Sequence, residues 1–164
     1  MIAGVKPAFA ARPGVILDQA AAELFERTFR EGIDLIDEVT AYLDGIGRLE
    51  CRRMSRGAAA DYAAESMRLT TRLMKVVAWL MMQKSVREGE ASPEAAADPR
   101  YRLGDPTSPR LSPQVPATLA FLSRRADRLH DRVSRMDRQM YVEIEVAANP
   151  VASQLERLRF AFAS

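Results

Sequence analysis

Few residues in this sequence could carry chemistry, and none stands in a spacing typical of catalysis. Cys51 lies beside Arg52 and Arg53, whose positive charge favours the thiolate, but no histidine is near in sequence. Asp127 and His130 lie one helical turn apart, as in half of a metal site in a helical bundle. Such a site needs a second histidine and more inward carboxylates, and His130 is the only histidine. The chain also lacks GxxxxGK, CxxC and HExxH motifs, so we expect no catalytic residue, metal or cofactor.

Composition indicates a single domain. The chain has 164 residues, of which 48% are hydrophobic and 28% are charged, which is enough to bury an ordinary core. With 24 basic and 22 acidic residues the formal net charge is +2, so nucleic acid is not the expected partner. The single cysteine excludes an internal disulfide, and the N-terminal segment does not resemble an export signal, so we expect a cytoplasmic protein. The apolar run at 73–82 is about half the roughly 20 residues that cross a bilayer, so no membrane span is expected.

The segment 65–84, ESMRLTTRLMKVVAWLMMQK, is too apolar for a helix with one buried face. On a helical wheel, one face carries Leu69, Leu73, Val76 and Leu80. A second face carries Met67, Met74, Ala78 and Met81. We expect both faces to be covered by neighbouring helices, with the methionines as core filler. A remaining stripe is free to face water or another protein: Arg68, Arg72, Lys75 and Trp79.

Helical periodicity predicts an all-α protein with three long helices, near 16–44, 58–88 and 113–147, packed as a three-helix bundle over 16–148. Residues 1–15 are expected to form a flexible arm, and 149–164 a C-terminal tail. The basic, glycine-containing segment 45–57 is interpreted as a solvated loop. Gly89 is expected to cap the second helix, and Ser112 with Pro113 to begin the third. Residues 90–116, with six prolines and one short turn near Ser92, are either functional or disordered.

The third helix has a coiled-coil-like apolar seam, and its opposite side is rich in arginine, including Arg128 and Arg132. A solvated face is one interpretation of these arginines, and a surface for an acidic partner is the other. The tail carries Leu155, Leu158, Phe160 and Phe162, which either dock on the bundle or contact another protein. On the first helix, Phe29 and Ile33 lie beside the main apolar stripe, which suggests a dimer contact.

The run AESMRLTTRLMKVVAWLMMQKSVREGE at residues 64–90 closely resembles the signature of a bacterial family, DUF1465, the family of regulators of CtrA degradation. The plan of an N-terminal helix, this segment, a proline-rich connection and a third long helix agrees with that family. The resemblance implies a homodimeric three-helix bundle without enzymatic activity. It further implies an adaptor that helps deliver cell-cycle proteins such as CtrA to the ClpXP protease.

The resemblance also names partners. In the family the protease is primed by the response-regulator-like protein CpdR, and a further adaptor such as PopA can connect to CtrA. A flexible C-terminal tail is implicated in the family's function, but no tail motif can be matched residue by residue to 150–164.

For Arg68, Arg72 and Trp79, partner binding competes with a structural interpretation, in which the guanidinium groups pair with carboxylates of neighbouring helices and the indole is partly buried. Two other functional classes stay open. One is a nucleic-acid-associated regulator that uses the arginines at 48–56 and on the third helix. The other is a bundle or enzyme that binds a small molecule in an internal pocket.

Overall fold

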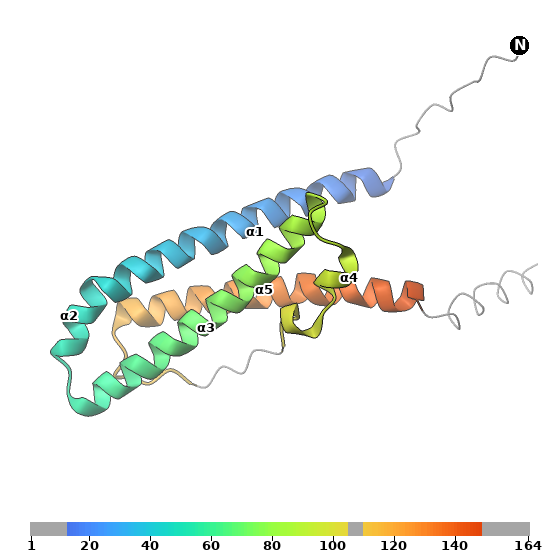
Figure 1. The fold of residues 1–164 in the computed structure, drawn as a ribbon. Coiled ribbons are helices and arrows are strands. Elements are labelled where there is room, and N and C mark those ends of the chain that lie inside the picture. The colour runs from blue at the N-terminus through green and yellow to red at the C-terminus, as the bar shows by residue number, and fades with distance from the viewer. Residues whose placement is uncertain (1–12, 105–109, 149–164) are drawn as a thin grey trace, which may run out of the picture.

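Three helices of 32 residues each form the frame of the molecule: α1 (Pro13–Asp44), α3 (Arg56–Arg87) and α5 (Ala117–Ala148) (Figure 1). Shorter elements join them: α2 (Ile46–Arg52), α4 (Pro93–Ala96) and the 3-10 helix η1 (Pro99–Tyr101). This computed structural model describes residues 13–104 and 110–148. Every regular element in those ranges is helical, which confirms the all-α class.

Helix α1 runs antiparallel to α5, whereas α3 runs parallel to α5. Two ion pairs join α1 to α5 in antiparallel order: Glu38–Arg125 and Glu31–Arg132. Two hydrogen-bonded pairs join α3 to α5 in parallel order: Trp79–Asp137 and Gln83–Tyr141. A helix of 32 residues is about 48 Å long, so the chain must return over that distance between two parallel helices. Chain topology therefore explains the length of the 88–116 connection. The sequence had suggested only that this segment is functional or disordered.

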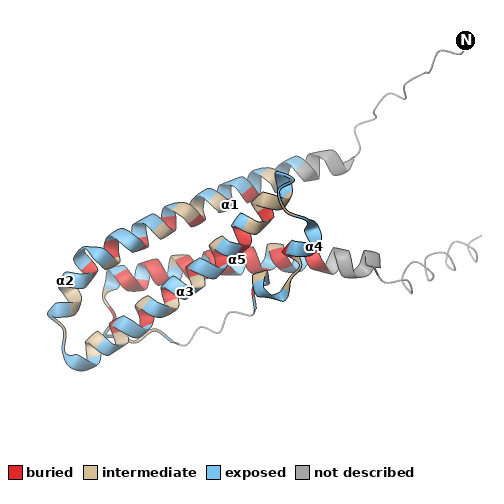
Figure 2. Ribbon diagram, in the orientation of Figure 1, coloured by how far each residue is buried: buried red, intermediate tan, exposed pale blue. Residues whose placement is uncertain are grey.

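The face of α3 that carries Leu69, Leu73, Val76 and Leu80 is buried, as predicted. It packs with aliphatic and aromatic residues of α1 and α5 in one core (Figure 2). These include Phe25, Leu35, Val39, Leu119, Leu129 and Val133. Full burial of a side chain of this size contributes about 1.5–3 kcal/mol, so this cluster is the main source of stability.

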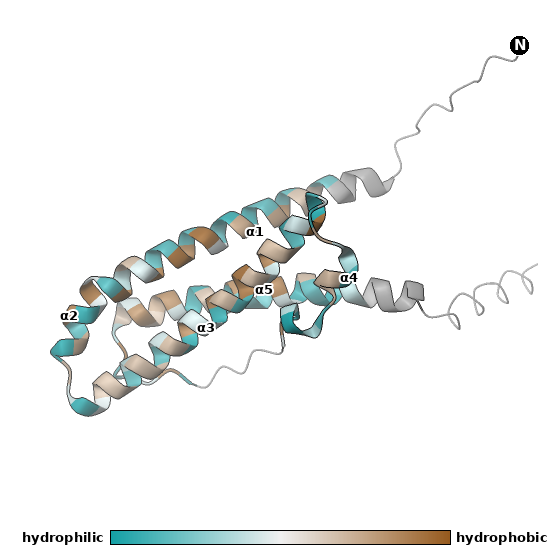
Figure 3. Cartoon of the chain, in the orientation of Figure 1, coloured by the Kyte–Doolittle hydropathy of each residue, from teal (hydrophilic) through white to brown (hydrophobic). Residues whose placement is uncertain are grey.

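The second apolar face of α3 contradicts the prediction. Met67, Met74 and Met81 retain 72%, 65% and 50% of their accessible surface, so no described helix covers them. Apolar residues recur along the whole of α3 (Figure 3), but α1 and α5 cover only part of its circumference. These three methionines are therefore surface residues.

The 45–57 segment is a second correction, because it contains helix α2 where a loop was expected. Gly47 permits this helix, since a Cβ atom there would lie 2.5 Å from the Tyr62 hydroxyl oxygen. Tyr42 also donates a hydrogen bond to Glu50 Oε2 at 2.6 Å, which ties α2 to α1. Tertiary packing thus stabilises a helix whose own periodicity is poor.

Helix ends differ from the predicted ones by a few residues. α1 already begins at Pro13, so residues 13–15 are helical and not part of an arm. Ser55 caps α3 by accepting a hydrogen bond from the Ala58 amide. α5 begins at Ala117 and not at Pro113, because Pro113 and Pro116 keep the chain in a turn before the helix. Ser112 caps that turn and donates to Asp61 at 2.5 Å.

Gly89 ends α3 as predicted, with φ of +76°. Its amide donates to the Val86 carbonyl at 3.1 Å, and the Glu90 amide donates to the Ser85 carbonyl at 2.8 Å. These two bonds form a Schellman motif, which needs a left-handed residue after the helix.

A buried polar network joins α3, α5 and the connection. Asp137 is 1% exposed, and its Oδ1 accepts a hydrogen bond from Trp79 Nε1 at 2.7 Å. Arg102 Nε lies 3.0 Å from both carboxylate oxygens of Asp137. Tyr141 donates to the Ala96 carbonyl at 2.5 Å, and its ring lies 3.9 Å from the Arg102 guanidinium carbon. The connection is therefore fixed to the long helices at two points.

We expect Asp137→Ala to lower the free energy of unfolding by about 2–3 kcal/mol, because it leaves the buried Trp79 N–H without its acceptor and Arg102 without its carboxylate. Urea unfolding followed by circular dichroism measures the change. Asp131→Ala, at an exposed position of the same helix, is the control and should change stability by less than about 0.5 kcal/mol. Equal effects of the two substitutions would contradict the role of the network.

We expect Gly89→Ala to destabilise the protein by about 1 kcal/mol, because an L-residue is strained at this positive φ. Space is not the cause, since a Cβ at Gly89 would meet no atom within 4 Å. Gly57→Ala is the matched control, because Gly57 lies in the first turn of α3 and its Cβ would also be in open space. It should stabilise by up to about 0.5 kcal/mol, since alanine favours the helix. The same sign of change for both variants would contradict this explanation.

Candidate protein-docking groove

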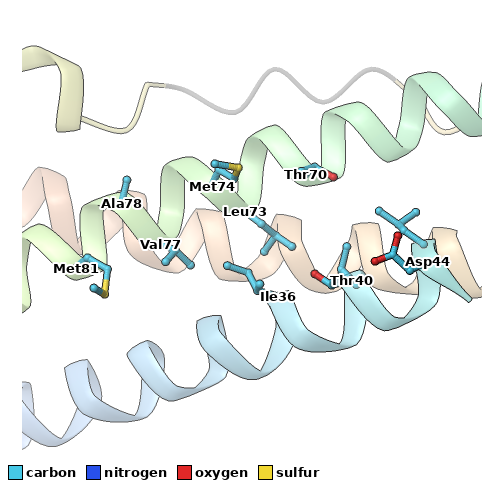
Figure 4. A pocket seen from close by; sticks show the side chains of 11 residues that line it. Ile36, Thr40, Asp44, Thr70, Leu73, Met74, Val77, Ala78 and Met81 are labelled. Atoms are coloured by element: carbon cyan, nitrogen blue, oxygen red, sulfur yellow. The ribbon is translucent and has the colours of Figure 1, made fainter.

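An apolar groove of about 540 Å³ runs between α1 and α3 (Figure 4). Val39 and Leu73 are buried at its base, and Ile36, Leu43 and Val77 are half-buried along its walls. Exposed residues form its rim: Thr40, Asp44, Thr70, Met74, Ala78 and Met81. Asp44 is the one charged residue among the described lining residues. The groove can therefore hold an apolar side chain or an apolar helix face, and it offers little to a polar ligand.

The α3 wall of the groove continues as a long seam that is exposed except at its half-buried last residue, Ser85. Met67, Met74 and Met81 are seven residues apart and so lie on one side of the helix. Ala63, Thr70, Ala78 and Ser85 share that side, and none of the seven is charged. We call these seven residues the methionine seam. Heptad spacing is the pattern by which one helix packs along another, so the seam suits a helical partner.

The α1 side of the groove carries negative charge. Asp44 lines the groove, and Asp37 is exposed seven residues earlier on the same side of α1. A partner helix with basic residues beside its apolar stripe would place positive charge against them. The groove thus has an apolar base with charge on one side only.

The predicted Arg68, Arg72 and Trp79 surface does not exist as such. Trp79 is fully buried, because its indole N–H is turned inward to Asp137. Arg72 forms an ion pair with Asp127 of α5, and Arg68 pairs with the buried Glu65 one turn earlier on α3. The structural interpretation of these three residues therefore describes them better than partner binding.

The arginine side of α5 is only partly available to a partner. Arg132 pairs with Glu31, and Arg125 pairs with Glu38, both on α1. Arg128 is exposed. Since two of these guanidinium groups hold helices together, the phosphate-contacting surface of the nucleic-acid alternative is weaker than the sequence suggested.

The two residues expected at a dimer contact are half-buried in the single chain. Phe29 stacks on Phe25 with ring centroids 6.3 Å apart, and Lys84 Nζ lies 4.7 Å from the Phe29 ring centre. Ile33 lies one turn before Ile36, which lines the groove. Leu155, Leu158, Phe160 and Phe162 lie outside the described residues.

The described side chains that could take part in catalysis or bind a metal form no common site, because each is buried, half-buried or already paired with another residue. Cys51 is half-buried against the core, and Asp127 is occupied by Arg72. His130 is buried, with Nδ1 3.3 Å from the Ser134 hydroxyl. In the described part of the chain no three His, Cys, Asp or Glu side chains gather as metal ligands. Within the same residues, no helix combines the length and apolarity that crossing a membrane requires.

The methionine seam is the feature that sequence reasoning missed. Its signal was present, because three methionines recur at seven-residue spacing and the residues on their side of the helix carry no charge. The wheel gave the correct side for these residues but not the number of helices that cover it.

Comparison with known proteins identifies the family of this chain and a similar solved structure. The family model described as "Protein of unknown function (DUF1465)" matches residues 16–162. The crystal structure of RcdA from Caulobacter crescentus CB15 is similar, with 50% sequence identity and a TM-score of 0.63. The match covers 73% of this chain and 92% of the RcdA chain. No curated protein matches.

We expect His130 to make stability depend on pH. Burial lowers the pKa of His130 below its ordinary value of 6.5, and the charges of Arg72 and Lys75 lower it further. The unfolded chain then binds the proton more tightly than the folded chain does. The contribution of His130 to the free energy of unfolding is therefore complete above pH 6.5 and is lost as pH falls through the pKa of the folded protein. In that window the loss approaches about 1.4 kcal/mol per pH unit.

Urea unfolding at pH 7, 6 and 5 measures this dependence, with His130→Gln as the comparison. The variant should lose less stability over the same range, because glutamine does not titrate. Parallel pH profiles for the two proteins would contradict the assignment to His130.

Proposed function

Because this chain belongs to the bacterial family described as protein of unknown function DUF1465, we propose that it is a non-enzymatic adaptor for regulated proteolysis. In this role it helps deliver cell-cycle regulators such as CtrA to the ClpXP protease through protein–protein contacts. It acts in the cytoplasm as a homodimer, contacts protease primed by CpdR, and can engage a further adaptor such as PopA. Its 50% identity to RcdA supports this choice over the nucleic-acid and small-molecule alternatives.

The observation that carries the proposal is the exposed methionine seam beside the α1–α3 groove. Water-soluble proteins rarely leave an apolar strip of this length uncovered unless a partner covers it. Burial of the exposed parts of Met67, Met74 and Met81 would contribute about 3–6 kcal/mol to binding, before the entropic cost of association. Methionine is also unbranched and flexible, so one seam can adapt to several partner helices, as an adaptor requires.

Self-association is assigned to the α1 side of the same region. Ile33 is half-buried beside the groove wall, and Phe29 lies one turn further from the groove. Their remaining exposed surface is small, so these two residues can form only part of an interface that a stable dimer needs. We therefore expect other residues of α1 or α3 to complete it.

The adaptor role is tested by degradation of candidate cell-cycle substrates by purified ClpXP with CpdR, with and without this protein. Faster turnover in its presence is expected. A form truncated after Asn149 should keep cooperative thermal unfolding and lose delivery if the tail contacts a partner. Unchanged turnover of every candidate, together with no binding of any, would refute the role.

We expect the double substitution Met74→Glu with Met81→Glu to reduce delivery at least tenfold, because it places charge in the middle of the methionine seam. Thermal stability should change little, since both side chains are at least half exposed. Leu49→Glu, at a 55% exposed position of α2 outside the groove, is the matched control and should keep delivery. Equal delivery by all three proteins would show that the seam has no part in it.

A further inference from the structure

A second cleft lies on the opposite side of Met74 and Ala78 from the groove. It has a volume of about 520 Å³ and lies between α3 and the segment from Pro99 to Leu103. Met74 and Ala78 line both hollows, so these two residues form the wall that separates them. The remaining lining residues are Thr71, Lys75, Pro99, Arg100, Tyr101, Arg102 and Leu103.

The charge of this cleft is opposite to that of the groove rim. Its described lining residues include Lys75, Arg100 and Arg102 but no carboxylate. Arg102 is engaged, because its Nε lies 3.0 Å from both carboxylate oxygens of the buried Asp137. Arg100 keeps 74% of its side-chain surface in water although it pairs with Asp98 at 2.9 Å. Lys75 is exposed on α3, so two cations remain accessible at the mouth.

The base of the cleft is apolar and its shape is fixed. Leu103 is buried, Tyr101 is half-buried, and Met74 and Ala78 supply the α3 side. The Arg102–Asp137 contact holds one end of the 99–103 segment, and the hydrogen bond from Tyr141 to the Ala96 carbonyl holds the chain before it. A site that is already formed binds without the cost of ordering a loop.

We propose that this cleft binds an acidic segment of a partner protein, with an apolar side chain on Met74 and Leu103 and carboxylates on Lys75 and Arg100. Arg100 Nη2 already donates to Asp98, but the guanidinium has further N–H groups that can bind a carboxylate of the partner, and the ammonium of Lys75 supplies a point charge. Nucleic acid fits less well, because a phosphate backbone needs a long basic stripe and this cleft has an apolar base with two accessible cations. The inference deepens the proposed adaptor role, on which its biological meaning rests.

Two hollows that share one wall give a physical basis for holding two partners at once. The groove suits an apolar helix with basic flanks, and the cleft suits an acidic segment. Because Met74 lines both the groove and the cleft, a ligand bound in one site can change how this side chain packs in the other site. The affinities of the two ligands are then coupled, and the coupling is reciprocal.

The test uses the full chain labelled with ¹³C at its methionine methyl groups. The probe is a synthetic decapeptide in which Asp and Glu flank a central leucine, and the control peptide replaces them with Asn and Gln. We expect the acidic probe to shift the Met74 methyl signal and leave Met67 and Met81 in place, because only Met74 lines the cleft. The control peptide should bind at least about tenfold more weakly, with the difference reduced by salt.

Variants assign the binding to the two cations. Lys75→Gln and Arg100→Gln should each weaken the acidic probe about tenfold, measured by fluorescence anisotropy. Lys84→Gln is the matched control on α3, and it should leave the affinity unchanged because Lys84 lies outside the cleft. Arg100 is largely exposed, so its replacement keeps the fold, and circular dichroism checks each variant.

Several results would overturn the inference. These are equal affinity for the neutral peptide, a shift at Met81 in place of Met74, unchanged binding by both cation variants, and tighter binding of single-stranded DNA of the same charge. The binding measurement contains no protease, so a failed degradation assay leaves it standing. Conversely, loss of this site would not remove the groove on which the adaptor proposal depends.

Discussion

The contact between Trp79 and Asp137 is the constraint on which the arrangement of this molecule depends. A carboxylate that is 1% exposed is stable only when donors surround it, and its donors come from α3 and from the connection before α5. A shift of α5 by one turn would leave the carboxylate, the indole N–H and Arg102 without their partners. The network therefore fixes both the register of α3 against α5 and the path of the 99–103 segment.

The rotation of α3 follows from the same contact. With Trp79 turned toward α5 and Leu69, Leu73 and Leu80 turned into the core, the methionine seam must point away from α5. It then lies beside α1, where the groove forms, while the anchored 99–103 segment encloses the cleft on the far side of Met74. Both candidate sites are therefore consequences of how one tryptophan is buried.

Periodicity predicted the long helices and the main core face correctly, since these depend on residues close in sequence. It failed for Trp79, because the acceptor of its indole N–H, Asp137, is 58 residues away in the sequence. No sequence pattern paired these two residues. It failed for the methionine seam because a wheel shows that a face is apolar but not whether another element covers it. Helix α2 was missed for a related reason, since Gly47 is useful only once Tyr42 and Tyr62 lie against it. The cleft could not have been predicted, because it needs the 99–103 segment to fold back on α3.

The parallel direction of α3 and α5 also determines how the chain can fold. α1 and α3 are joined through the short α2 and can pair as soon as both exist, whereas Arg72 and Asp127 are 55 residues apart. Closing so long a loop costs entropy before any contact is gained, so docking of α5 should be the slow step of folding. During synthesis, α3 leaves the ribosome before its second partner has been made. Until then Trp79, the methionine seam and the part of the α3 core face that packs on α5 are exposed together, and the nascent chain is at its most vulnerable to aggregation.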